Sequence, residues 1–186
     1  MTFEPFDNPL LTYRPHGTAE VNAVFGDPTR GGLYLKVPDP KWEQRSIIEC
    51  HEGRTDYPPM LPQLARYYWQ CHRLAEPSMR EALRRVELVA PGYITERGGT
   101  WSYVFRRMRH DTPERAKKAG RPLLPLSRHS WGIAMDIEPG RNKAKQFAPG
   151  KTPKPWSPAW MMVWPDGVTP EIVEAMKSCG FEWGGD

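Results

Sequence analysis

The sequence contains no long hydrophobic run and no leader pattern. No stretch approaches 18 consecutive apolar residues, which a helix needs to cross a bilayer. The opening residues, Met-Thr-Phe-Glu-Pro, include neither a cationic head nor an apolar segment, so they do not resemble a secretory signal. We therefore expect a protein that is made in the cytoplasm and has no membrane span.

Cysteine is scarce. Cys50, Cys71 and Cys179 are odd in number and form no Cys-x-x-Cys pair, which argues against a disulfide scaffold and favours reduced thiols. Two dyads, Cys50-His51 and Cys71-His72, could in principle supply four metal ligands. Neighbouring side chains on a helix or strand point apart, however, so we expect Cys71 to lie in the core instead.

Proline, by contrast, is abundant. The 186 residues include 21 prolines, about double the usual share, which predicts a loop-rich domain with short elements. Apolar residues make up 39% of the chain and charged residues 26%, a globular composition. This length suits one domain with a substantial core.

Positive charge is unevenly distributed along a chain whose net charge is +4. Residues 139–165 contain no acid, and a second basic stretch runs from Arg97 to Arg128. The cations of the acid-free tract are Arg141, Lys143, Lys145, Lys151 and Lys154. Such tracts can contact nucleic acid, a membrane surface or an anionic polymer, and a solvated face is an equally good interpretation. Because the aromatic interleaving of nucleic-acid modules is missing, we expect no nucleic-acid partner.

The two parts of the chain differ in periodicity. Residues 1–60 are dense in proline and glycine, which predicts an irregular N-terminal arm packed on the following domain. Within the arm we expect a short helix near Val21 and a short strand at Leu33–Val37. Residues 61–186 form the domain itself.

The domain is expected to begin with two helices. Apolar spacing predicts a helix over Leu61–Leu74 that Pro77 ends. Ser78 and Glu81 then form the capping-box pattern of a second helix. Its buried stripe is Met79, Leu83 and Val86.

Strands and a late helix follow. Glu87–Ala90 and Trp101–Phe105 have strand-like composition. A helix starting at Thr169-Pro170 and ending before Gly180 would bury Val173, Ala175 and Met176. The tryptophans at 156, 160 and 164 either line a cleft or pack in the core. The order of elements predicts the α+β class with a small antiparallel sheet flanked by helices.

One segment carries candidate chemistry. Gly132–Ile137 is expected to be a strand with Ala134 and Asp136 on one face, and His129 lies in the loop before it. An imidazole and a carboxylate that converge there are suitable zinc ligands. A buried His–Asp pair joined by a simple hydrogen bond is the alternative.

The pattern Ser-x-His-x-x-Gly-x-Ala-x-Asp over residues 127–136 resembles the first zinc motif of a peptidase family. This family contains zinc D-alanyl-D-alanine carboxypeptidases and L-alanyl-D-glutamate endopeptidases, including VanY-type enzymes and phage endolysins. The ending Gly-Phe-Glu-Trp-Gly-Gly-Asp at 180–186 is similar to a second family stretch, and Tyr103-Val-Phe-Arg106 is similar to its Tyr-x-x-Arg segment.

The resemblance implies a hedgehog/DD-peptidase-like fold and a zinc peptidase that cleaves peptidoglycan stem peptides beside a D-amino acid. His129 and Asp136 would hold Zn²⁺. Arg106 would act in catalysis by stabilising an oxyanion or would bind a substrate carboxylate, a role that Arg107 or Arg109 could take instead. The resemblance also assigns substrate contacts to Ser127 and Trp183.

The family pattern continues past the point that Asp186 matches, to a third ligand histidine and a carboxylate base. We therefore expect the gene to encode more chain, with a catalytically inactive relative that binds wall peptide or a protein partner as the alternative. The active form would be a monomer of phage-endolysin type that is released on lysis and acts on the cell wall.

Overall fold

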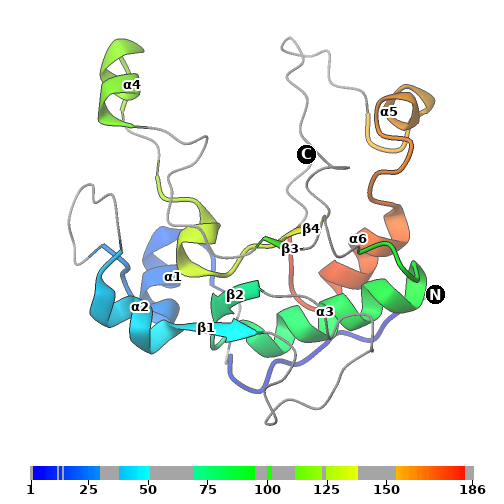
Figure 1. Cartoon of the computed structure of the whole chain (residues 1–186), viewed down its shortest axis with the longest axis horizontal. Coiled ribbons are helices and arrows are strands. Elements are labelled where there is room, and N and C mark those ends of the chain that lie inside the picture. Colours follow the sequence, from blue (N-terminus) through cyan, green and yellow to red (C-terminus); the bar gives the residue numbers. More distant parts are fainter. Residues whose placement is uncertain are drawn as a thin grey trace.

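The computed structural model describes residues 2–11, 13, 15–29, 38–50, 69–94, 100–101, 112–122, 125–137 and 154–182. Short helices and two small antiparallel sheets make up these parts, so the α+β class is confirmed (Figure 1). No helix in them is both long and apolar enough to cross a membrane. The elements are α1 (Gly17–Phe25), α2 (Pro40–Ser46), β1 (Ile47–Cys50), β2 (Trp69–His72), α3 (Glu76–Val89), β3 (Thr100–Trp101), α4 (Pro113–Lys118), the 3₁₀ helix η3 (Arg128–Trp131), β4 (Asp136–Ile137), α5 (Pro158–Val163) and α6 (Pro170–Lys177).

The centre of the fold is the β1–β2 sheet beside the packed pair α3 and α6 (Figure 1). β1 and β2 run antiparallel, with Ile47 opposite His72 and Cys50 opposite Trp69. The prediction of a helix over Leu61–Leu74 is therefore wrong at Trp69–His72, which form β2. Residues 61–68 of the predicted helix lie outside the described residues. The pairing partner of β2 is distant in the sequence, so local periodicity carries no information about it.

The helix α3 begins two residues earlier than predicted. Pro77 lies in its first turn, where its missing N–H costs no helical hydrogen bond, instead of ending a preceding helix. The capping box is also wrong, because the Ser78 hydroxyl accepts a hydrogen bond from Asn8 at 2.9 Å and the Glu81 carboxylate binds arginines of its own helix. The predicted stripe is confirmed: Met79, Leu83 and Val86 are fully buried.

Two predictions of strands meet different outcomes. Glu87–Ala90 was predicted as a strand, but α3 continues through Val89, and the Glu87 carboxylate accepts a bond from the Gly92 amide at 3.0 Å. The strand at Trp101–Phe105 is present as β3 at its first residue, which pairs with Asp136, while 102–105 lie outside the described residues.

The last helix forms as predicted. Thr169 caps α6 by accepting a hydrogen bond from the Ile172 amide at 3.4 Å, and Pro170 occupies its first turn. Val173 and Ala175 are buried as expected, whereas Met176 is only partly buried, and Gly180 adopts a positive φ of 93° after the helix. The helix therefore presents its apolar side to α3, as its sequence pattern required.

The N-terminal segment is fastened to α3 and α6. The buried Arg85 donates to the carbonyl of Glu4 and to the Ser178 hydroxyl, both at 2.7 Å. The Phe6 amide bonds the Ser178 carbonyl at 2.7 Å, and the Asn8 side chain bonds the Leu74 carbonyl at 2.9 Å. Further along the chain, α1 matches the helix expected near Val21, whereas α2 and β1 form where no regular element was predicted. The strand expected at Leu33–Val37 lies outside the described residues.

Candidate metal centre

The candidate centre is built on η3, which carries His129. Ser127 caps this short helix: its hydroxyl accepts a hydrogen bond from the His129 amide at 3.4 Å. The Ser130 amide bonds the Ser127 carbonyl at 2.8 Å, which closes the turn. Ser127 therefore has a local structural role at the base of the candidate centre.

Gly132 ends η3 and holds it against β2. Its backbone is left-handed, with φ 68° and ψ 31°, which favours glycine. Its carbonyl accepts a hydrogen bond from the His72 amide at 2.9 Å. A Cβ on this glycine would lie 2.6 Å from the same His72 nitrogen, so the close approach leaves no space for a side chain.

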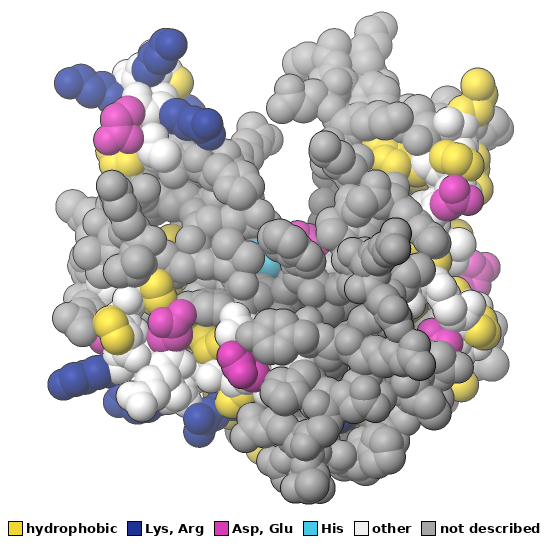
Figure 2. All heavy atoms as spheres, in the orientation of Figure 1, with side chains coloured by type: hydrophobic (Ala, Val, Ile, Leu, Met, Phe, Trp, Pro, Cys, Tyr) yellow, Lys and Arg dark blue, Asp and Glu magenta, His cyan; other side chains and the backbone are white. Residues whose placement is uncertain are grey.

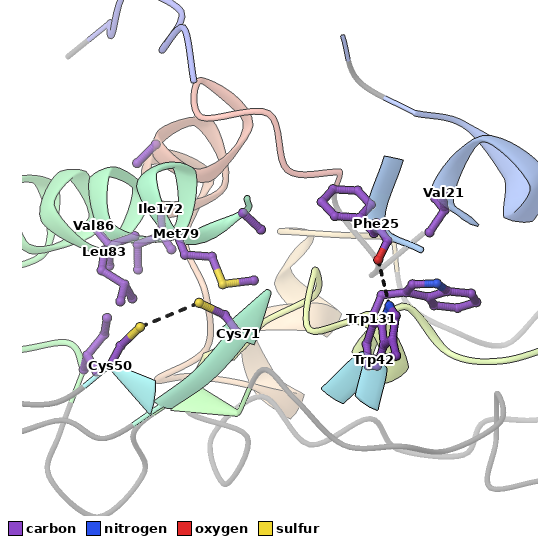
Figure 3. Packing of buried hydrophobic residues seen from close by; sticks show 13 residues of the cluster. Val21, Phe25, Trp42, Cys50, Cys71, Met79, Leu83, Val86, Trp131 and Ile172 are labelled. Atoms are coloured by element: carbon purple, nitrogen blue, oxygen red, sulfur yellow. Dashed lines mark hydrogen bonds between the residues drawn. The ribbon is translucent and has the colours of Figure 1, made fainter. Parts of the chain in front are cut away.

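Trp131 anchors the other side of η3. The indole is 1% exposed, and its N–H is shared between the Asn22 side-chain oxygen and the Gly26 carbonyl, each at 3.0 Å. In Figure 3 it lies with Val21, Phe25 and Trp42 in one aromatic part of the core. The turn that bears His129 is thus fixed by both β2 and α1.

Asp136 reaches His129 from β4. Its Oδ1 lies 3.4 Å from His129 Nε2, and the exposed side-chain fractions are 45% for the aspartate and 9% for the histidine. Gly132–Ile137 was predicted to be one strand, but only Asp136–Ile137 is, because Gly132 still belongs to the end of η3. The predicted convergence of the two side chains is nevertheless present. Figure 2 shows a small histidine surface and an acidic surface near the centre of the view.

This separation fits two ligands of one tetrahedral zinc ion. Zinc–nitrogen and zinc–oxygen bonds of about 2.0–2.2 Å place two tetrahedral ligand atoms about 3.3–3.5 Å apart. The donor set, one imidazole nitrogen and one carboxylate oxygen, also suits zinc. Within the described ranges, no group of three or more His, Cys, Asp or Glu side chains is close enough to hold a metal ion.

One comparison with known proteins found a match. A family model described as D-alanyl-D-alanine carboxypeptidase matches residues 122–186. This match supports the peptidase family. It spans η3, β4, α5 and α6, and so includes both candidate ligands. No curated protein and no solved structure matched the chain.

Of the other predicted site residues, the structure places only Ser127. Arg106, its substitutes Arg107 and Arg109, and Trp183 lie outside the described residues. The structural role of Trp131, which anchors the matched segment to α1, was not predicted from the sequence. Its position two residues after His129 was the available signal, because a tryptophan in a glycine-bounded turn is a large apolar group that needs a buried partner.

The neighbouring His72 serves the fold. Its Nδ1 accepts a hydrogen bond from the Leu74 amide at 3.2 Å, so the proton is on Nε2, which donates to the Phe25 carbonyl at 3.1 Å. Burial removes water from the imidazole and lowers its pKa to about 4. His72 is therefore a neutral core residue, and the four-ligand Cys/His alternative fails at this position.

Two of the three tryptophans at 156, 160 and 164 are buried. Trp160 and Trp164 are 8% and 9% exposed, and their ring centroids lie 4.2 Å apart. The Trp156 indole donates to the Val168 carbonyl at 3.1 Å. Of the two interpretations left open by the sequence, packing in the core describes Trp160 and Trp164.

Proposed function

We propose that this protein is a zinc-dependent peptidase that cleaves peptidoglycan stem peptides beside a D-amino acid. One observation carries the proposal: His129 Nε2 and Asp136 Oδ1 lie 3.4 Å apart inside the segment that matches the carboxypeptidase model. A simple His–Asp hydrogen bond is the alternative explanation of this contact. The metal centre is favoured because both residues belong to the pattern that resembles the family's first zinc motif, within the matched segment.

The chain's own residues prepare this centre. Ser127 and Trp131 fix the turn, so the buried imidazole of His129 is held in one direction before any ligand arrives. Asp136 supplies negative charge and is half exposed, so it is accessible from the solvent side. When bound, Zn²⁺ supplies a Lewis acid that polarises a peptide carbonyl and acidifies water.

Further roles come from the family resemblance. Arg106, a permanent cation with several donors, would stabilise developing negative charge or bind a substrate carboxylate. Ser127 and Trp183 would contact the peptide, and a histidine and a carboxylate base would complete the centre. The fold would be of the hedgehog/DD-peptidase type, and the enzyme would act as a monomer of phage-endolysin type.

The proposed partner is the bacterial cell wall. The cations Arg115, Lys117, Lys118 and Arg121 are all exposed on and just after α4, and Glu114 is the acid in the first turn of this helix. Figure 2 shows dark blue side chains gathered on the projection that carries α4. A cationic surface would attract the anionic groups of wall polymers and raise the rate of encounter.

The test combines metal analysis with product mapping. Full-length protein, purified and treated with purified stem peptide, should contain about one zinc per chain and yield fragments cut beside a D-residue. His129→Ala should lose both zinc and products. The matched control is His16→Ala, because the His16 side chain is 73% exposed and lies outside the matched segment.

Two outcomes would overturn the assignment. Unchanged zinc content in His129→Ala would remove His129 from the centre. Retention of stem peptide by the wild-type protein without any cleavage, with or without zinc, would favour the inactive wall-binding relative.

A further inference from the structure

Two of the three cysteines meet inside the core, away from the candidate centre. The Cys50 and Cys71 sulfur atoms are 3.7 Å apart, and their residues are 1% and 0% exposed. They come from neighbouring strands: Cys50 is opposite Trp69 and Cys71 is opposite Ile48, so the two cysteines are diagonal neighbours across the sheet. Figure 3 shows their side chains pointing toward one another beside Met79 and Leu83.

The two thiols are hydrogen-bonded to each other and are not joined by a disulfide. A disulfide needs its sulfur atoms about 2.05 Å apart, so the two must approach by about 1.7 Å. Diagonal neighbours across a sheet lie about 7–8 Å apart, and disulfides span Cα atoms about 4.4–6.8 Å apart, so closure also requires the backbones of β1 and β2 to approach each other. Neither sulfur has a role in the proposed peptidase chemistry.

We propose that Cys50 and Cys71 form an oxidation site, which closes into a cross-strand disulfide when the protein meets a small-molecule disulfide. This inference does not rest on the peptidase function, because it concerns the β1–β2 sheet alone. An enzyme that acts outside the cell would nevertheless leave the reducing cytosol and reach conditions in which disulfides persist.

The chemistry balances as two exchange reactions. The thiolate of one cysteine attacks a sulfur of oxidised glutathione, which forms a mixed disulfide and releases one reduced glutathione. The second thiolate then attacks the protein sulfur of that mixed disulfide and releases another reduced glutathione. Two thiol protons pass to the solvent or to the released thiolates, and both electrons reduce the small-molecule disulfide. Because the thiols are buried, the first attack requires local opening of the sheet.

The crosslink would strengthen a weak point of the fold. A two-stranded sheet is marginally stable by itself, and the chain between these cysteines is 20 residues long. Closing that loop covalently lowers the entropy of the unfolded state. It would also stiffen β2, whose His72 amide holds Gly132 below the candidate centre.

The test uses the full chain without substrate. The protein is incubated with a series of glutathione redox ratios, then alkylated in denaturant, and its thiols are counted by mass. Free thiols should fall from three to one, and a peptide joining Cys50 to Cys71 should appear without retained glutathione. The melting temperature should rise by roughly 5–10 °C on oxidation and return with a reductant.

Cys179→Ala is the matched variant, because it removes a buried cysteine and should leave closure intact. Cys50→Ala should abolish both the crosslink and the redox-dependent melting shift. Three free thiols at ratios that oxidise a reference dithiol would overturn the proposal, and so would stable glutathione adducts on Cys50 or Cys71. Mapping of the wild-type chain decides the question even where Cys50→Ala does not fold.

Discussion

Replacing Gly132 by alanine tests whether the core positions the candidate centre. The added methyl group would lie 2.6 Å from the His72 nitrogen and 3.1 Å from the Cys71 carbonyl carbon, both of which are backbone atoms of β2. Rotation of a side chain cannot relieve that contact. Either η3 moves away from β2, or the hydrogen bond from His72 to the Gly132 carbonyl lengthens from 2.9 Å.

The cost has two parts. A non-glycine residue in the left-handed region costs roughly 1–2 kcal/mol, and overpacking a filled site costs roughly 1–3 kcal/mol. Gly132→Ala should therefore lower the free energy of unfolding by roughly 2–5 kcal/mol. For a chain of this size, the melting temperature should fall by about 5–15 °C.

Thermal and urea unfolding of the purified chain measure the effect. Gly120→Ala is the control, because Gly120 also has a positive φ, of 60°, while nothing lies within 4 Å of its added Cβ. The control carries the backbone cost alone, about 1–2 kcal/mol. Equal destabilisation of the two variants would refute the close approach of η3 to β2, and unchanged zinc binding in a destabilised Gly132→Ala would refute its control over the centre.

Two further predictions concern the core around the centre. Burial lowers the pKa of His72 from 6.5 to about 4, so between these pH values the folded state binds fewer protons than the unfolded state. The free energy of unfolding should therefore be highest above pH 6.5 and fall by up to roughly 3 kcal/mol as the pH drops to 4. In urea unfolding, His72→Gln should flatten this pH dependence. Arg85→Lys should destabilise the fold by roughly 1–3 kcal/mol, because the guanidinium bonds Glu81 through Nε and the Glu4 carbonyl and Ser178 through Nη1, whereas a lysine carries all its donors on one nitrogen. Proteolysis near Glu4 should become faster, and an unchanged cleavage rate would contradict the role of Arg85 in holding the N-terminal segment.

The sequence was most informative where structure depends on neighbouring residues. Thr169-Pro170 predicted the start of α6 because a cap needs only an oxygen acceptor and the next few amides. The stripe of α3 followed from helical spacing alone. His129 and Asp136 could be paired because a short turn and a short strand separate them, and the structure confirms that they converge.

The predictions of local structure failed where residues distant in the sequence determine the conformation. Trp69–His72 has helix-like apolar spacing, but its backbone pairs with β1, which precedes it by about 20 residues. Ser78 matched a capping box, yet Asn8 binds its hydroxyl from the far N-terminal segment. The tight contact between Gly132 and His72 was equally invisible, because it depends on how β2 is placed beneath the turn.

The two candidate ligands are held unequally, and this difference has a measurable consequence. His129 is buried on a turn that Trp131 and Gly132 bind to the core. Asp136 is half exposed, and the β3–β4 ladder has two residue pairs among the described residues. A ligand that joins the two side chains should therefore order β4 more than η3. Hydrogen exchange with and without added zinc measures this: protection should increase at the Asp136 and Ile137 amides and change little at the Ser130 amide. Equal gains in both segments would mean that the core does not preposition His129.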